Sequence, residues 1–189
     1  MLQKKMTILC LSVAIAMLVA TTLTNTRIAS AQDEAVKIVV NLDDFHFTVP
    51  GQDTTAPITL KAGQLYDMTI TNVGKYDHEI WWGKTAQMGD EGRLDGYATN
   101  LLENVPLVIT QAAGDDQAEI NVSGLIEIKE APGQSFTIEF TLPATAVGQW
   151  EIGCFQPMPK GTAAAPVSGT AVPDVPHYMA GMKMDLIVK

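Results

Sequence analysis

The amino-acid sequence predicts an all-β protein, a sandwich or barrel built from short strands. Segments rich in β-branched and aromatic residues recur along the chain, many of them with apolar side chains at every second position. Turn-forming pairs such as Pro50-Gly51 and Pro132-Gly133 separate these segments. Helical periodicity is almost absent. The chain has 189 residues, which is enough for one domain with a sizeable core.

Alternation of apolar and polar residues identifies the individual strands. In residues 65–71, Tyr66, Met68 and Ile70 share one face, so this strand is expected to be half-buried. In residues 148–154, Cys154 shares a face with two apolar residues at the end of the strand. The expected strands, eight to ten in all, come from residues 36–42, 45–49, 57–60, 65–71, 78–82, 118–122, 125–129, 135–142, 148–154 and 182–188.

Two stretches lack this pattern and are expected to be long loop insertions. Residues 84–117 are rich in Gly, Asp, Asn and Gln, and we expect a helical turn near Leu101 within them. Residues 158–176 consist largely of Pro, Gly and Ala, a composition that buries little surface and is typical of an exposed loop. Long loops in compact domains often carry function.

The N-terminal segment has the features of a secretory signal peptide. Lys4 and Lys5 precede an uncharged, mostly apolar run, and Ala29-Ser30-Ala31 matches the pattern of a cleavage site. The alternative is an uncleaved membrane anchor, but the apolar run is shorter than the roughly 20 residues that a span needs. We therefore expect a signal peptide over residues 1–31, a single domain over residues 32–189, and a periplasmic or secreted protein without a membrane span.

The exported chain is acidic. Cleavage would remove three basic residues and no acidic one, leaving nine basic and 21 acidic residues and a net charge of −12. This charge argues against nucleic acids and anionic membranes as partners and fits a soluble protein that meets a basic partner. We expect a monomer.

The cysteine count indicates a metal site. Cys10 lies in the segment that would be cleaved, so Cys154 is the single cysteine of the exported chain and has no partner for an intramolecular disulfide. Its thiol is free, pairs between chains, or binds a metal. A free thiol is easily oxidised outside the cytoplasm, so metal binding explains the residue best.

Four side chains make up a candidate copper site. Cys154, His177 and Met182 lie near one another in the sequence, and His78 follows a tight turn at the start of a predicted strand. Two His, one Cys and a weakly bound axial Met are the ligands of a mononuclear blue copper centre, because thiolate suits Cu(I) and imidazole suits both oxidation states. We expect His78, Cys154 and His177 to form the trigonal plane and Met182 the axial position.

Other residues near these four were also considered. Met158, Met179 and Met184 are rivals to Met182 as the axial ligand, whereas His46 is expected on the protein surface. Further residues are expected around the metal, either contacting its ligands or, for the two tryptophans, lying beside the copper or in an apolar docking patch: Tyr76, Glu79, Trp81 and Trp82.

Three segments of the chain resemble those of the cupredoxins, small blue copper proteins such as plastocyanin, azurin and auracyanin. The segments are Asn72-Val-Gly-Lys-Tyr-Asp-His78-Glu79, Cys154-Phe-Gln-Pro157 and His177-Tyr-Met-Ala-Gly-Met182. The resemblance covers residues 36–189. It implies a Greek-key β-sandwich that holds one type 1 copper ion and carries single electrons between larger redox proteins. It departs from the family in one respect, because 22 residues separate Cys154 from His177 where the family has only a few.

Other functions remain as alternatives. A copper-binding protein for storage, delivery or resistance is the second hypothesis, favoured by the additional methionines. A hydrolase that uses Cys154 as its nucleophile would need an oxyanion hole, for which the sequence carries no signature, so we expect a protein that is not an enzyme. Zinc is a poorer choice than copper, because Met is a poor zinc ligand.

Overall fold

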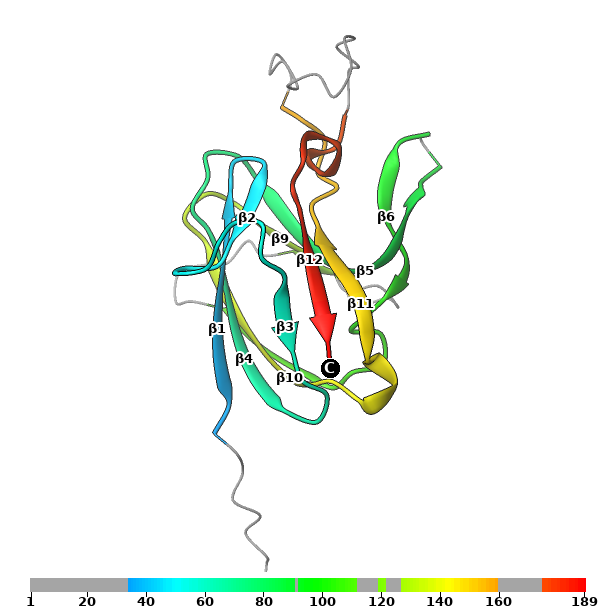
Figure 1. Cartoon of the computed structure of the whole chain (residues 1–189). Coiled ribbons are helices and arrows are strands. Elements are labelled where there is room, and N and C mark those ends of the chain that lie inside the picture. Colours follow the sequence, from blue (N-terminus) through cyan, green and yellow to red (C-terminus); the bar gives the residue numbers. More distant parts are fainter. Residues whose placement is uncertain (1–33, 91, 112–118, 122–126, 160–174) are drawn as a thin grey trace, which may run out of the picture. The chain divides into compact units, whose positions relative to one another are not determined.

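The predicted all-β sandwich is confirmed by the computed structural model, in which two β-sheets pack face to face (Figure 1). The structure describes residues 34–90, 92–111, 119–121, 127–159 and 175–189, so the expected signal peptide lies outside the described residues. Nearly every predicted strand is present within one or two residues of its expected ends. No helix in these described ranges is both long enough and apolar enough to cross a membrane.

The first sheet has five strands, of which β1 and β4 run parallel and the other neighbours run antiparallel. Its strand order does not follow the sequence, as is usual in Greek-key sandwiches. In spatial order the strands are β2 (His46–Thr48), β1 (Val36–Asp43), β4 (Leu65–Asn72), β10 (Ser135–Thr141) and β7 (Leu107–Gln111).

The second sheet has seven strands; His78 is the first residue of one of them, and Cys154 and Met182 directly adjoin two others. The C-terminal strand lies between β3 and β11, so residues far apart in sequence meet in one layer. In spatial order its strands are β3 (Ile58–Leu60), β12 (Lys183–Val188), β11 (Gly148–Gly153), β5 (His78–Met88), β9 (Glu127–Glu130) and β8 (Glu119–Asn121), and β6 (Leu94–Asn100) also pairs with β5. Two short 3₁₀ helices, η1 (Ala144–Ala146) and η2 (His177–Ala180), lie outside the sheets.

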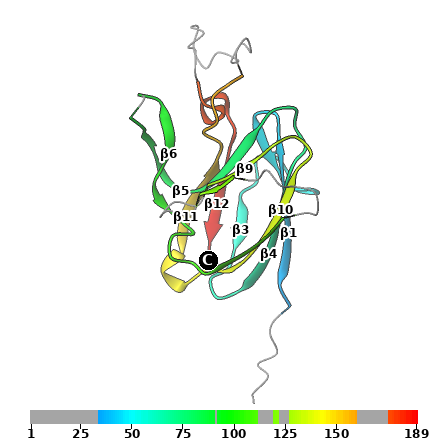
Figure 2. The ribbon, with the colours of Figure 1, turned by 180° about the vertical axis from the view of Figure 1, so that it is seen from behind.

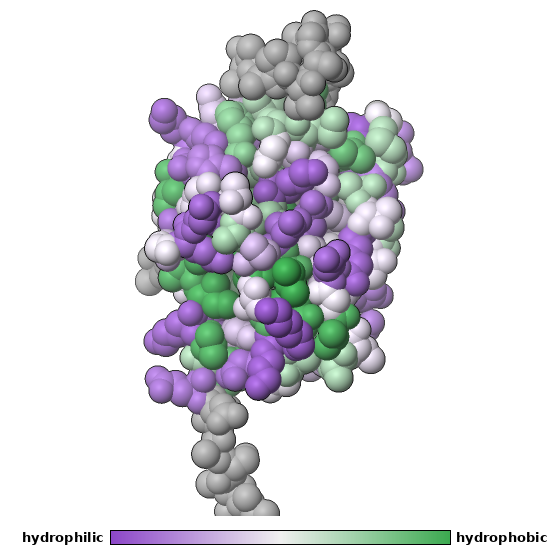
Figure 3. Space-filling view, in the orientation of Figure 1, coloured by the Kyte–Doolittle hydropathy of each residue, from purple (hydrophilic) through white to green (hydrophobic). Residues whose placement is uncertain are grey.

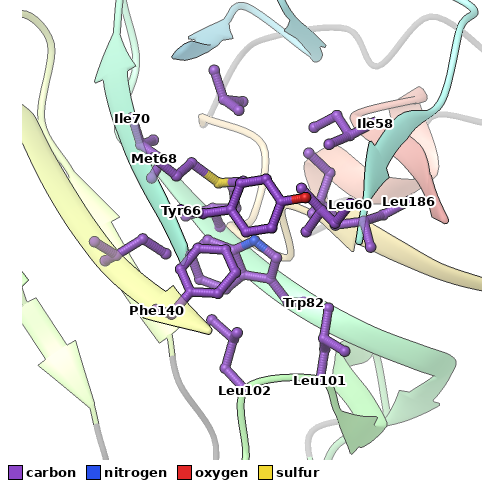
Figure 4. Packing of buried hydrophobic residues seen from close by; sticks show 14 of the residues in the cluster. Ile58, Leu60, Tyr66, Met68, Ile70, Trp82, Leu101, Leu102, Phe140 and Leu186 are labelled. Atoms are coloured by element: carbon purple, nitrogen blue, oxygen red, sulfur yellow. The ribbon is translucent and has the colours of Figure 1, made fainter. Parts of the chain in front are cut away.

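The core lies between the two sheets. Strand β4 alternates strictly, with Tyr66, Met68 and Ile70 buried and their neighbours half-buried, as its sequence predicts. These side chains face Trp82 of β5 and Phe140 of β10 (Figure 4). Burial of apolar surface of this kind is the main stabilising contribution to such a fold.

Residues 84–117 differ most from the sequence-based expectation. Strand β5 continues to Met88 and pairs antiparallel with β6, with a register shift between Ala86 and Met88, and β7 follows. Leu101 and Leu102 are buried in a turn rather than in a helix. Viewed from behind in Figure 2, β6 extends beyond the sandwich. Its burial does not alternate, because the neighbours Gly96 and Tyr97 are both buried and the neighbours Ala98 and Thr99 are both exposed. This pattern explains why the sequence shows so little apolar alternation here.

Candidate metal centre

Three side chains converge at one end of the sandwich. The ligand atoms of His78, Cys154 and His177 all lie within 4.8 Å of one another, and all three residues are buried. The two Nδ1 atoms are 3.1 Å apart, and Sγ of Cys154 lies 3.4 Å from Nδ1 of His177 and 3.9 Å from Nδ1 of His78. The structure therefore brings together two nitrogen donors and one sulfur donor from three separate segments of the chain.

Each of the three residues lies where a regular element begins or ends. His78 is the first residue of β5, Cys154 directly follows β11, and His177 opens the helix η2. Strands β5 and β11 are hydrogen-bonded neighbours, with Gly153 opposite Trp81. Their backbones thus fix the positions of His78 and Cys154 before any metal binds.

The two ends of the long segment between Cys154 and His177 are joined by backbone hydrogen bonds. Backbone N–H groups of His177 and Met158 donate to the carbonyls of Gln156 and Val175, at 2.8 and 2.9 Å, and Pro157 and Pro176 form an antiparallel β-bridge. Of the expected exposed loop over residues 158–176, residues 160–174 lie outside the described residues. Because the bridge joins the two ends of this segment, the number of residues above it does not determine where His177 lies.

Burial controls the protonation of the three donors. It lowers the pKa of His177 to about 4, with His78 adding to the effect, and it lowers the pKa of His78 against the opposing charge of Asp44. Both imidazoles are therefore neutral at pH 7 and have a lone pair to offer. Burial also raises the pKa of the Cys154 thiol, with Glu79 adding to the effect, so the thiolate needs a cation beside it.

Met182 is fully buried next to these donors. Its backbone N–H donates to the carbonyl of His177 at 3.0 Å, and its carbonyl accepts from the N–H of Cys154 at 3.1 Å. Gly181, which precedes it, has a φ of 108°, a left-handed conformation that ends η2 and favours glycine. Of the rival methionines, Met158 and Met184 are also buried, whereas Met179 is 44% exposed.

Glu79 holds the cysteine loop in place. Its backbone N–H lies 3.4 Å from Sγ of Cys154, and its carboxyl oxygens accept from the N–H of Phe155 at 2.8 Å and from Nε2 of Gln156 at 3.0 Å. Burial and a hydrogen bond to Glu127 raise the pKa of Glu79 to about 8. Of the residues expected to contact the ligands, Glu79 thus contacts the sulfur directly, through its backbone N–H.

The loop before His78 is anchored by a residue that sequence reasoning assigned no role. Asn72, which is fully buried, donates from Nδ2 to the carbonyls of Tyr76 and Glu130 and accepts at Oδ1 from the N–H of Gly74. Asn72 begins the segment that resembles the cupredoxins, and this position was the available signal for its importance. Its contacts fix the tight turn that leads into β5.

A second aromatic cluster covers the outer side of the strands that carry the ligands. It consists of Trp81, Tyr97 and Phe155, with Tyr178 packed against them. The rings of Phe155 and Tyr178 are stacked at 4.9 Å, and each follows a candidate ligand in the sequence. Trp81 lies in this cluster and Trp82 in the main core, and both are buried, so of the two expectations for them the apolar docking patch is not met.

Aromatic side chains also cover His177. The ring of Phe45 makes an edge contact with the imidazole at 5.0 Å and stacks on Tyr76 at 5.8 Å. His46, next to Phe45, is exposed as predicted and interacts with Asp43 rather than with the buried donors. On the face shown in Figure 3, the upper end, where η2 lies, is mostly weakly hydrophobic, whereas the lower half mixes hydrophilic side chains with strongly hydrophobic patches.

The donor set fits a copper ion. Two neutral imidazole nitrogens and one thiol sulfur face one another in a buried space, and the thiol is the ligand type that selects soft metals such as Cu(I). A divalent or monovalent cation between them would stabilise the thiolate that burial otherwise disfavours. Fold and site together define a β-sandwich with a buried candidate metal centre of two nitrogens and one sulfur at the end of its strands.

Comparison with solved structures returns matches of low sequence identity. Matches include reduced auracyanin from the photosynthetic bacterium Roseiflexus castenholzii (19% identity, 82% of this chain and 98% of that chain, TM-score 0.43). They also include auracyanin A, a "blue" copper protein from Chloroflexus aurantiacus (17% identity, 82% and 99%, TM-score 0.41), and a multicopper oxidase (11% identity, 82% and 44%, TM-score 0.46). No protein-family model and no curated protein sequence matches the chain.

The auracyanins belong to the family that the sequence motifs resemble. The oxidase shows that chains with catalytic activity also match this structure. At these identities and TM-scores the comparisons carry no argument about function. The functional argument rests on the geometry of the three donors.

Proposed function

We propose that this protein is a type 1 copper protein that carries single electrons between larger redox proteins. The observation that carries the proposal is the convergence of His78, Cys154 and His177, whose ligand atoms lie within 4.8 Å of one another at the end of two paired strands. Bound copper would supply the one-electron couple between Cu(I) and Cu(II). One ion would bind per chain, in the three-donor site.

The residues of the chain have separate roles in this proposal. The two imidazoles and the thiolate would hold the ion, and Met182 would supply a weakly bound thioether sulfur that tunes its potential. Glu79 holds the cysteine loop and donates its backbone N–H to the sulfur. Burial of all three donors excludes water, so the residues around the ion, rather than solvent, set its preference between the two oxidation states.

Electron transfer fits the site better than catalysis does. The donors are fully or almost fully buried, with exposed fractions of 0% for His78 and Cys154 and 1% for His177. A catalytic metal keeps an open position for water or substrate, and the buried arrangement together with an axial Met leaves little room for one. We therefore propose an electron carrier rather than an enzyme.

Copper storage or delivery is the second candidate function. It is favoured by the 44% exposure of Met179, a soft ligand type, in the helix that begins with His177. In that case the protein would retain Cu(I) and would have no stable Cu(II) form. An electron carrier must instead hold the ion in both states without loss.

The decisive experiment is copper loading of the purified protein. We expect one copper per chain, an intense visible absorption band from the copper–thiolate bond, and a reversible one-electron couple by voltammetry. The absence of the band, or binding of several copper ions without a reversible couple, would contradict the assignment as an electron carrier. Tight Cu(I) binding without a Cu(II) form would support the second candidate.

We also propose that the protein works outside the cytoplasm with a basic redox partner. The supporting observations are the signal-like residues 1–31 and the net charge of −12 without them. Association with a basic partner should weaken as salt increases, because screening reduces electrostatic steering. Cell fractionation and N-terminal sequencing of the mature protein test the location and the cleavage site.

A further inference from the structure

The ring nitrogen of His78 that points away from the three-donor site faces a carboxylate. Nε2 of His78 is buried and lies 3.7 Å from Oδ1 of Asp44, which is longer than a hydrogen bond, and no side chain or backbone group of the described residues forms a hydrogen bond with this nitrogen. A movement of roughly 0.7 Å would bring the pair to the usual N–H···O distance of about 3.0 Å. Asp44 is placed for this contact because its Oδ1 also accepts from the N–H of Lys75 at 2.7 Å.

The absence of a side chain at residue 74 makes this contact possible. A Cβ added to Gly74 would lie 2.6 Å from Oδ1 of Asp44 and 2.9 Å from Nε2 of His78, both too close for real atoms. Gly74 is held in position by its own N–H, which donates to Oδ1 of Asn72 at 2.9 Å. The conformation of the turn thus leaves the space in which the Asp44 carboxylate approaches the His78 imidazole, so this is not a chance contact on the surface.

We propose that Asp44 is the positioning residue of His78, accepting the Nε2–H proton when Nδ1 binds the metal. This inference rests on the proposed copper function and deepens it. Binding through Nδ1 leaves the imidazole proton on Nε2, because a neutral ring carries one proton on one of its two nitrogens. A carboxylate that accepts this proton fixes the ring orientation and increases the basicity of the ligand.

The contact has a consequence for the redox potential. A more basic imidazole stabilises Cu(II) more than Cu(I), because the higher charge gains more from electron donation. The carboxylate charge acts in the same direction. Asp44 should therefore lower the reduction potential of the site and increase its affinity for Cu(II).

Two other acidic residues near His78 allow this contact to be separated from a general charge effect. Asp43 and Asp77 also act electrostatically on His78, but more weakly than Asp44. Their side chains are 44% and 54% exposed and interact with His46 and Lys129 respectively. Asp43 carries the same charge next to Asp44 in the sequence, so it is the matched control.

The test compares Asp44→Asn, Asp44→Ala and Asp43→Asn in the copper-loaded protein. In Asp44→Asn the amide oxygen still accepts the proton but the charge is lost. We expect its Cu(II) affinity to fall about tenfold, within the range for partners of metal ligands, and the potential to rise by about 59 mV if Cu(I) affinity is unchanged. Asp43→Asn should change the affinity by less than about fivefold, because exposed charges are screened.

Nuclear magnetic resonance of the diamagnetic Cu(I) form gives an independent measurement. The Nε2–H proton of His78 should exchange slowly with water in the wild type and in Asp44→Asn, and faster in Asp44→Ala, which has no acceptor. A purely structural role of Asp44 would not produce this order. Equal potential shifts in Asp44→Asn and Asp43→Asn, or equal exchange rates in all variants, would overturn the proposal.

Failure of this inference is distinguishable from failure of the proposed function. A wild-type protein that binds copper with the visible band, but whose potential responds equally to both Asn variants, retains the copper function and loses the role of Asp44. A wild-type protein without a copper band and without metal uptake overturns both.

Discussion

Strands β4 and β5 follow one another in the chain but are buried in different ways. In β4 every second residue is buried and its neighbours are half-buried, the pattern of a strand with one face toward the core. The first six residues of β5, from His78 to Gly83, are all buried. The main core covers one face of β5, and the cluster of Trp81, Tyr97 and Phe155 covers the other.

The difference shows that the strand with a candidate ligand is packed on both of its faces. The strand that carries His78 and Glu79 is fixed from both sides, whereas β4 is fixed from one. Metal ligands must be held within tight tolerances by residues that are themselves locked in place. If the candidate site depends on this packing, changes in β5 and its contacts should affect the protein more than changes in β4.

Cys154→Ser should have the largest effect on the copper spectrum, and this effect should be confined to the metal site beside β5. The hydroxyl cannot replace the soft thiolate, so the intense visible band should disappear while the sandwich remains folded. Absorption and circular dichroism spectra of the copper-loaded variant check both parts. A variant that keeps the same band would show that the ligand assignment is wrong.

Gly83→Ala should destabilise the protein by about 1–3 kcal/mol or more, the usual cost of overpacking. A Cβ at this position would lie 2.4 Å from Cβ of Tyr97 and 2.5 Å from the backbone oxygen of Thr99, so the outer face of β5 has no space for it. Urea unfolding of the metal-free protein measures the effect. An unchanged midpoint would indicate that the β5–β6 hairpin packs more loosely than described.

The metal-free protein should lose stability as the pH falls from about 6.5 to about 4. Burial lowers the pKa of His177 to about 4, below its ordinary value of 6.5 in the unfolded chain. The unfolded state therefore binds more protons in this range, and folding stability rises with pH across it. Unfolding midpoints measured between pH 4 and pH 7 check the sign, and bound copper should extend the dependence below pH 4, because it keeps His177 unprotonated in the folded state while the unfolded chain still binds the proton.

Met182→Leu should keep the visible band and raise the reduction potential. The axial sulfur is a weak ligand, so the thiolate that gives rise to the colour remains, but the loss of a donor disfavours Cu(II). The expected rise is about 59 mV for each tenfold loss of Cu(II) affinity relative to Cu(I). Met184→Leu is the matched control, and a larger shift there would move the axial assignment to Met184.

Thr69→Ala in β4 should have the smallest effect. Its hydroxyl lies 3.0 Å from that of Thr137 on the outer, half-buried face of the first sheet. Substitutions on such a surface usually change stability by less than about 0.5 kcal/mol, and the copper band should be unaffected. A loss comparable to that of Gly83→Ala would contradict the contrast between the two strands.

Much of this structure is predictable from the sequence because it depends on local pattern. Period-two alternation predicted strands such as β4 and β10, and residue chemistry together with the resemblance to the cupredoxins indicated the three donors that the structure brings together. The continuation of β5 beyond Trp82 and its pairing with β6 were missed because these residues lack apolar alternation. Asp44 was missed because its role depends on a long-range contact across 34 residues, which no local pattern records.

The β-bridge between Pro157 and Pro176 separates two tasks that share one segment of chain. The residues from Cys154 to Pro157 and from Pro176 to His177 determine the spacing of the two candidate ligands. The residues between Pro157 and Pro176 can be exchanged or removed without changing that spacing, since loop length adds little to the cost of closure. A recognition sequence for a chosen electrode or partner could therefore be inserted into this segment without changing the spacing of the two candidate ligands.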